Sequence, residues 1–543
     1  MTAIPRSRFG ETVIYQIYPR SFADSTGNGI GDLAGITAHL DYLAGSPDSL
    51  GVTAIWLSPF YPSSMADFGY DITDYCNVDP LFGTLEDFDE LLEQAHRRRM
   101  QVLLDLVPNH TSDEHPWFME SRSSRDNPKR DWYIWRDAKP NGSPPNNWLG
   151  SFGGSAWEYD DNTGQYYMHS FLAKQPDLNW QNPAVRRAIN DVVRFWARRG
   201  VDGFRVDAAS WLSKDLKWRD NPINHNFDPA KDGPEQAVLP KYNRSGPHLY
   251  DYLQGIANVV GEFPGRYMIT EAYPDESDDP EKYYTKLYRN VDASLSAPFN
   301  FELIFADWTA PTVKKIIDDF QRDMQPEYTP VYCLGNHDQQ RLASRIGEQQ
   351  ARMAALLLLT LPGVPVLYYG DELGMTDGDI SPDQRQDPAQ GWTGSTSGRD
   401  PARTPMLWSN QPNAGFTSGQ PWLRGNSVFA SRNAELQRHD DYSSWHLYKR
   451  LLQLRKDLPA LDTGSYQPLE VDNGDVYGFR RSLDDQKLTI LLNFSDDEQT
   501  VVCPLEPGRL LMTSVPEGEP IRHENRIRMR PYEAVLLEDI KED

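Results

Sequence analysis

Three carboxylates in this sequence each follow a predicted strand. Asp207, Glu271 and Asp338 come after the apolar runs 203–206, 267–270 and 331–334. If these strands lie parallel in a barrel, their carboxyl ends share one face, and the three side chains converge on one pocket. An ionised carboxylate beside a second one with a raised pKa can cleave a glycosidic bond. A local salt bridge would explain one such residue, but not three at separate strand ends.

Basic and aromatic residues near these carboxylates fit the same chemistry. Arg205 precedes Asp207 by two positions, so both side chains point to one face of the strand. An arginine beside a carboxylate favours the ionised form that a nucleophile needs. His110 and His337 also follow predicted strands. The chain contains 15 Trp and 27 Tyr, whose rings suit the faces of sugars.

Strand and helix patterns alternate along most of the chain. Residues 13–18, 52–57 and 101–107 are strand-like. Helical periodicity follows Thr84 and again Asn182-Pro183, where capping residues stand before the apolar positions. Repeated βα units favour an α/β fold, a closed (β/α)8 TIM barrel rather than an open doubly wound sheet.

Two regions depart from this alternation. Residues 110–175 form a long connection rich in Trp, Asn, Gly and Pro, which predicts a small domain inserted after strand 3. The last part, 461–543, predicts an antiparallel β-sandwich, with a hairpin of strands 469–471 and 476–479 joined at Asn473-Gly474. The barrel is thus expected to comprise 1–109 and 176–460.

The composition excludes several classes of partner. The chain has 543 residues, and 54 Lys and Arg against 79 Asp and Glu give a net charge of −25. Nucleic acids and anionic membranes attract basic faces, so neither is expected as a partner. Cys76, Cys333 and Cys503 lie too far apart to suggest disulfides or a zinc site. Residues 1–6 lack an apolar leader, so a cytoplasmic protein is expected; monomer and homodimer both stay open.

A glycine-rich stretch near the N-terminus carries oxygen ligands at alternating positions. Acidic residues and the lack of a following lysine argue against a phosphate loop, and the absence of Glu at the twelfth position excludes an EF-hand. The oxygen ligands therefore predict a structural Ca²⁺ site, and a solvated glycine-rich turn is the alternative. The expected calcium ligands are Asp24, Thr26, Asn28, Ile30 and Asp32.

Several sequence blocks surround the candidate residues. They are 105–110 (DLVPNH), 203–207 (GFRVD), 269–271 (ITE) and 336–338 (NHD), with 13–22, 175–179 (QPDLN) and 398–406 (GRDPARTPM) elsewhere. Together they resemble the α-amylase superfamily of glycoside hydrolases, family GH13, and within it the oligo-1,6-glucosidase and α-glucosidase branch. The resemblance covers essentially the whole chain and implies no organic cofactor.

The resemblance implies a role for each candidate residue. Asp207 would form a β-glucosyl-enzyme, while Glu271 would protonate the leaving oxygen and then deprotonate the incoming water. Asp338 would bind ring hydroxyls and help distort the sugar. The residues implied for the pocket of the terminal glucose are Asp67, Tyr70, His110, Phe152, Phe171, Gln175, Arg205, His337 and Arg399.

The expected activity is that of a retaining, exo-acting α-glucosidase on short oligosaccharides. In this branch Val after the nucleophile accompanies α-1,6 preference, so Ala208 favours α-1,4 or mixed cleavage, unless a small residue merely packs there. A transglucosidase, trehalose synthase or sucrose isomerase would use the same carboxylates. The stretch 339–342 lacks the Arg-rich loop typical of sucrose isomerases. A non-catalytic transporter ectodomain would carry a membrane span and lack the carboxylates.

Overall fold

The structure is a computed structural model of the chain. It describes residues 9–229, 234–271, 273, 280–388, 398–502, 508–515, 521–523 and 526–539. Residues 1–6 and Cys503, which enter the predictions on the leader and the cysteines, lie outside this part. Within it, none of the helices combines the length and the apolar character needed to cross a membrane.

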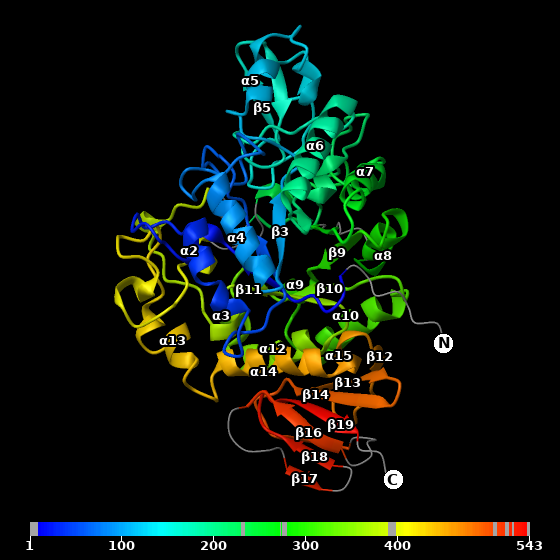
Figure 1. The fold of residues 1–543 in the computed structure, drawn as a ribbon. Helices are drawn as coiled ribbons and strands as arrows, with labels where there is room; N and C mark the ends of the chain where they lie inside the picture. The colour runs from blue at the N-terminus through cyan, green and yellow to red at the C-terminus, as the bar shows by residue number, and fades with distance from the viewer. Residues whose placement is uncertain are drawn as a thin grey trace.

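Eight parallel strands close into a barrel, which confirms the predicted fold class (Figure 1). Around the barrel their order is β1-β11-β10-β9-β8-β7-β3-β2. Most of these strands are buried along their whole length, which explains their nearly continuous apolar runs. Their bounds are β1 (Ile14–Ile17), β2 (Ala54–Leu57), β3 (Gln101–Leu106), β7 (Gly203–Val206), β8 (Tyr267–Thr270), β9 (Ser296–Asn300), β10 (Val331–Cys333) and β11 (Val364–Tyr368).

Helices connect the barrel strands, α13, α14 and α15 follow the last of these strands, and the sequence signals at helix ends act as expected. Thr84 and Asp87 form a capping box at the start of α4. Asn182 caps α6, Pro183 is its first residue, and Gly200 ends it with a left-handed φ of 113°. The helices are α1 (Pro19–Phe22), α2 (Leu33–Ala38), α3 (Leu40–Leu43), α4 (Leu85–Arg97), α6 (Pro183–Arg199), α7 (Leu249–Gly261), α8 (Pro280–Asn290), α9 (Glu302–Phe305), α10 (Ala310–Asp323), α11 (Leu342–Ile346), α12 (Glu348–Thr360), α13 (Ala434–Gln437), α14 (Ser444–Asp457) and α15 (Pro459–Asp462).

Short 3-10 turns occur mainly in the connections after strands. They are η1 (Arg130–Trp132), η2 (Ala209–Leu212), η3 (Pro234–Ala237), η4 (Asp371–Leu373), η5 (Pro382–Gln384), η6 (Asp400–Arg403), η7 (Pro412–Gly415) and η8 (Ser427–Ala430). The turn η2 begins two residues after Asp207 and η4 follows β11, so both belong to loops at the carboxyl face of the barrel.

The connection between β3 and β7 carries its own small sheet. Helix α5 (Pro116–Ser123) precedes the antiparallel strands β4 (Trp135–Arg136), β5 (Trp157–Asp160) and β6 (Gln165–Met168). Trp148 and Trp157 belong to a separate apolar cluster there. Figure 1 shows this segment at one end of the barrel and the C-terminal sheets at the other.

Two antiparallel sheets form the C-terminal part. The larger has the order β12-β13-β14-β19-β16 and the smaller β15-β18-β17. Alternate residues of the larger sheet face in opposite directions: Leu491 and Val535 pack with the smaller sheet, whereas Ile490 and Leu536 join the core of the barrel. The strands are β12 (Ser465–Pro468), β13 (Val476–Leu483), β14 (Gln486–Asn493), β15 (Gln499–Val502), β16 (Gly508–Thr513), β17 (Ile521–His523), β18 (Arg526–Met529) and β19 (Ala534–Asp539).

Two sequence expectations need correction. The hairpin strand predicted at 469–471 lies instead at Ser465–Pro468, where Pro468 pairs with Phe479. Asn473 therefore stands in a wider connection, in which its side chain accepts a hydrogen bond from the Asp475 amide at 2.9 Å. The barrel strand β9 was not predicted, because Pro298 and two polar ends hide it in the sequence SAPFN.

Candidate active site

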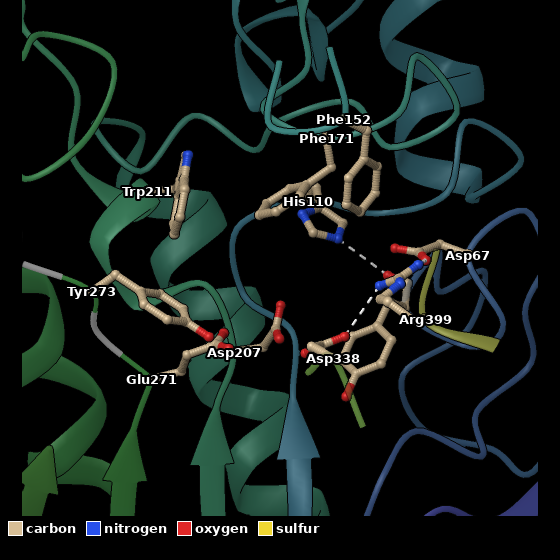
Figure 2. A pocket seen from close by; sticks show the side chains of 11 residues that line it. Asp67, His110, Phe152, Phe171, Asp207, Trp211, Glu271, Tyr273, Asp338 and Arg399 are labelled. Carbon is tan, nitrogen blue, oxygen red and sulfur yellow. Dashed lines mark hydrogen bonds and ion pairs between the residues drawn. The ribbon is translucent and has the colours of Figure 1, made fainter. Parts of the chain in front are cut away.

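The three candidate carboxylates line one pocket at the carboxyl ends of the barrel strands (Figure 2). Asp207 directly follows β7 and Glu271 directly follows β8, while Asp338 lies five residues beyond β10. About 430 Å³ of space lies within the pocket, part of it open to solvent. Its lining consists of Asp67, Tyr70, His110, Phe152, Phe171, Asp207, Trp211, Glu271, Tyr273, Asp338 and Arg399.

Arg205 holds the carboxylate cluster together from beneath the pocket. Its side chain is 1% exposed, and its guanidinium forms ion pairs with Asp207 and, at 2.6 Å, with Glu271. A third carboxylate, Asp105 on β3, accepts from the same guanidinium at 2.9 Å. The amide of Ala208 donates to the other oxygen of Glu271 at 2.8 Å, which fixes the orientation of that carboxyl group.

One guanidinium among three buried carboxyl groups leaves excess negative charge, which favours retention of protons. Burial raises the pKa of Asp207 well above its ordinary value, although Arg205 opposes the shift. Burial likewise raises the pKa of Asp105 to about 6. Protons in such a cluster belong to the group as a whole. The cluster can therefore retain a proton near neutral pH, as an acid beside a nucleophile requires.

Asp338 stands in the opposite electrostatic situation. It accepts hydrogen bonds from Arg403 at 2.9 Å and from Arg399 at 3.2 Å. Burial alone would raise the pKa of Asp338, but the guanidinium groups of Arg399 and Arg403 outweigh burial and hold the pKa well below its usual range. Asp338 is therefore ionised at neutral pH, and its oxygens act as hydrogen-bond acceptors.

Asp67 and Arg399 line the end of the pocket opposite Tyr273 (Figure 2). Arg399 pairs with Asp67 at 2.6 Å and with Asp387 at 2.7 Å, and its guanidinium lies 5.1 Å from the ring centre of Phe152. Gln175 donates to Asp67 at 3.0 Å, which brings a residue of the inserted segment to this end. The dashed line between Arg399 and Asp338 in Figure 2 marks their hydrogen bond of 3.2 Å.

Both candidate histidines are buried and neutral. Burial lowers the pKa of His110 to about 4, and its Nε2 lies 3.2 Å from Gln175 Nε2. Burial also lowers the pKa of His337 well below its usual value. His337 contacts Gln16 at 2.7 Å and the Tyr70 hydroxyl at 2.6 Å, and its ring stacks on that of Tyr70.

Of the predicted residues, Gln175, Arg205 and His337 lie behind the lining, where each contacts a side chain that lines the pocket. Sequence reasoning missed Trp211 and Tyr273, which line the pocket directly. Their places four residues after Asp207 and two after Glu271 were the available signal. Asp387 contacts Arg399 and Arg403 contacts Asp338, but neither Asp387 nor Arg403 lines the pocket. The sequence does not predict these contacts, because they depend on long-range packing.

The predicted calcium loop is closed by its own hydrogen bonds. Asp24 accepts from the amides of Thr26, Gly27 and Gly29, whereas Asp32 accepts from Ser25 and Gly35. Within the described residues, neither carboxylate pairs with a basic side chain, and no cluster of three or more His, Cys, Asp or Glu ligands occurs. The five proposed ligands are all oxygen donors, the type that Ca²⁺ prefers.

A closed barrel with carboxylates at its carboxyl face defines a class of barrel enzymes, and sequence comparison identifies the family. Residues 16–464 match the family "Alpha amylase, catalytic domain", and residues 468–536 match a domain of unknown function. The chain belongs to this α-amylase family, GH13, and is a glycoside hydrolase by its relatives.

Relatives match over nearly the full length. A probable α-glucosidase of Rhizobium meliloti is 42% identical, covering 91% of this chain and 90% of that protein. An oligo-1,6-glucosidase of Parageobacillus thermoglucosidasius is 38% identical, covering 96% of this chain and 97% of that protein. The crystal structure of an α-glucosyl transfer enzyme, XgtA, superposes with a TM-score of 0.90 at 38% identity, covering 98% of this chain and all of that one.

Proposed function

We propose that this chain is a retaining, exo-acting α-glucosidase that hydrolyses the terminal non-reducing α-glucosidic bond of short oligosaccharides. One observation carries the proposal: Asp207 and Glu271 share Arg205 in a pocket that is also lined by the ion pair of Asp67 and Arg399. Such a pocket accommodates one terminal sugar. A single guanidinium that bridges both carboxyl groups supports the short separation of a retaining pair.

In the proposed reaction, Asp207 attacks the anomeric carbon while Glu271 gives its proton to the leaving oxygen. Asp338 and Asp67, aligned by Arg399, accept hydrogen bonds from the ring hydroxyls, and bonds that strengthen in the transition state accelerate the step. Glu271 then takes a proton from water, whose oxygen attacks the anomeric carbon and displaces Asp207. Maltose-like α-1,4 bonds are the proposed substrates, with α-1,6 bonds and sucrose as further ones.

Proton NMR of a maltose digest, followed from the first seconds, tests this proposal. Early α-glucose without a new disaccharide is the expected result. Early β-glucose from the non-reducing end would contradict retention. New linkages with little free glucose would favour a transferase or isomerase, the alternative that similarity to an α-glucosyl transfer enzyme supports.

We also propose that Ca²⁺ binds the 24–32 loop, where it stabilises the fold and takes no part in catalysis. The support is the oxygen-only donor set, together with the lack of a basic side chain paired with Asp24 or Asp32 among the described residues. The loop is tied to the rest of the molecule, since the Thr417 hydroxyl donates to Asp24. A cytoplasmic location is likewise a proposal, supported by the widely separated cysteines.

A further inference from the structure

Another groove lies between the barrel helices and the C-terminal sheets, and we call it the junction groove. Helix α12 contributes Arg352 to its walls, α14 contributes Leu447 and Arg450, and strand β16 contributes Leu510 and Met512. About 870 Å³ of space lies within it, part of it open to solvent. Figure 1 shows α12, α14 and β16 at the end of the barrel opposite the inserted segment, so the junction groove is remote from the carboxylate pocket.

Arg352 lines the junction groove without a carboxylate partner. Its Nε donates to the carbonyl of Ser514 at 2.9 Å, and its Nη1 donates to the Ser444 hydroxyl at 3.1 Å. Both acceptors are neutral, and within the described part of the chain the guanidinium forms no ion pair. Burial lowers the pKa of Arg352, although Asp440 opposes the shift. A guanidinium that is partly withdrawn from water and held by neutral groups gains from a nearby anion.

Arg450 brings a second positive charge to the same groove. It is exposed, and among the described residues it forms neither a hydrogen bond nor an ion pair. Asp441 also lines the groove, but its carboxylate lies 3.7 Å from His446 Nε2. Asp440 accepts a hydrogen bond from the amide of Tyr442 at 3.0 Å. Two guanidinium groups therefore remain available to an anion at one place.

The rest of the junction groove is largely apolar. Leu447 and Met512 are buried side chains in its walls, and Leu510 packs against the apolar cluster between the two C-terminal sheets. Tyr442 adds an aromatic ring that is 61% exposed. A ligand that fills the groove must therefore combine an anionic group with an apolar body.

We propose that the junction groove binds a phosphate monoester, with its phosphate between Arg352 and Arg450 and its apolar part against Leu447 and β16. A phosphate dianion has three terminal oxygens and two charges, so it can accept hydrogen bonds from two guanidinium groups at once. The bound ester ties α12 and α14 to β16, and it stabilises the contact of the barrel with the C-terminal sheets. This inference does not depend on the function proposed above.

Calorimetric titration at pH 8 and fixed ionic strength tests the inference with inorganic phosphate and phenyl phosphate as probes. We expect a dissociation constant of about 1 mM for inorganic phosphate, the affinity that two charge-assisted contacts provide. Phenyl phosphate should bind about tenfold more tightly, because its ring is removed from water. The melting temperature should rise with the concentration of either probe. Failure of both probes to bind, or equal affinity for the two, would overturn the inference.

Variants assign the binding to the junction groove. Arg450→Gln removes one of the two guanidinium groups and should weaken the binding of both probes about tenfold. Asp441→Asn removes the acidic group from the lining and should tighten it. Arg187→Gln, at an exposed residue of α6 outside the groove, makes the same change of charge as Arg450→Gln and should leave the affinity unchanged. Equal affinities of the parent and Arg450→Gln would place the phosphate elsewhere and overturn the inference.

Stability and activity measurements separate this site from the other features of the molecule. Arg352→Gln also loses the hydrogen bonds to Ser514 and Ser444, so it should melt at a lower temperature even without phosphate. Arg450→Gln should melt like the parent without phosphate and show a smaller rise when phosphate is added. Its maltose turnover should equal that of the parent. Absence of maltose turnover in the parent would overturn the proposed function, whereas absence of phosphate binding would overturn this inference alone.

Discussion

Arg205 links the residues that the proposed chemistry uses. It contacts Asp105, Asp207 and Glu271 at once, so a change in any of these carboxyl groups alters the charge felt by the others. The excess negative charge favours a shared proton, and the amide of Ala208 orients the carboxyl group proposed to deliver it. Substitutions here must therefore preserve shape while changing one charge.

Asp207→Asn and Glu271→Gln each remove one charge and preserve the shape of the side chain. They should separate the role of the nucleophile from that of the proton donor. Asp207→Asn should lose nearly all turnover of every substrate, because no nucleophile remains. Glu271→Gln should reduce maltose turnover by about 10²- to 10⁴-fold. The rate of glucosyl-enzyme formation from 4-nitrophenyl α-glucoside should fall much less, because this leaving group needs no proton. Burst kinetics and thermal melts check this, with Glu262→Gln on the surface as the control. Near-normal maltose turnover in either variant would refute the assignment.

Ala208 offers a test of linkage preference. Its backbone is left-handed, with φ of 46°, and its side chain is 1% exposed beside the reacting groups. A β-branched residue is strained there, so absolute rates of Ala208→Val should fall. The ratio of isomaltose to maltose hydrolysis should nevertheless rise. Ala208→Gly, which removes the side chain, is the control; a ratio that Val leaves unchanged would refute this reading.

The sequence could indicate the three carboxylates because each stands beside an apolar run. Trp211 and Tyr273 follow Asp207 and Glu271 closely in the sequence, which is a signal, but the sequence does not say whether such a ring faces a cavity or the core. Asp387 was hidden for another reason. Its contact with Arg399 depends on how a long loop folds back over the barrel.

At the scale of elements, strand ends and helix caps were predictable because their signals are local. The sequence did not predict β9, because a proline weakens its strand signal. It also misplaced β12, because the Asn-Gly pair indicated a hairpin turn at the wrong position. The prediction of a closed barrel was correct despite both errors, because it depended on the alternation of many βα units.

The 24–32 loop carries a prediction on metal. If Ca²⁺ binds there, a chelator should lower the melting temperature and added Ca²⁺ should restore it, because a ligand that binds only the folded state stabilises it. Asp24→Asn should weaken the response to Ca²⁺. Asp48→Asn, an exposed residue outside the loop, should keep the full response. A melting temperature insensitive to both treatments would leave the loop as a turn held by its own hydrogen bonds.

The turn after β11 carries a prediction on pH. Glu372 accepts hydrogen bonds from Tyr15 at 2.9 Å and Tyr42 at 2.7 Å, and burial raises its pKa from 4.5 to about 7. Between these values the folded state binds more protons than the unfolded state, so stability from this group falls as pH rises, by roughly 3 kcal/mol in total.

Glu372→Gln removes the titration and keeps an acceptor for both tyrosines. Urea unfolding of the parent and the variant at pH 5 and pH 8 should show the variant gaining stability relative to the parent as pH rises. Glu435→Gln, on an exposed residue, should show no such gain. A parallel pH dependence of the parent and Glu372→Gln would contradict the expected shift.

At the scale of the whole molecule, the barrel joins two dissimilar additions. The inserted segment supplies Phe152, Phe171 and Gln175 to the active-site face, whereas the C-terminal sheets pack against α10 and α12 at the other end (Figure 1). The apolar core of the barrel includes residues of β13, β14 and β19. The C-terminal sheets therefore contribute to the stability of the barrel, and none of their described residues lines the pocket.

Arg481 on β13 makes this junction testable. Its side chain is fully buried and donates to the carbonyls of Thr360 at 2.6 Å, Leu461 at 2.9 Å and Gly464 at 2.9 Å. Arg481→Leu leaves these carbonyls without a donor, at a cost of about 1–3 kcal/mol each, partly offset because a charge is no longer buried. The melting temperature should fall clearly, whereas Arg509→Leu, which breaks an exposed ion pair, should change it little. Because the core is shared, calorimetry should show one transition in both variants. A separate early transition in Arg481→Leu would mean that the C-terminal sheets unfold independently of the barrel.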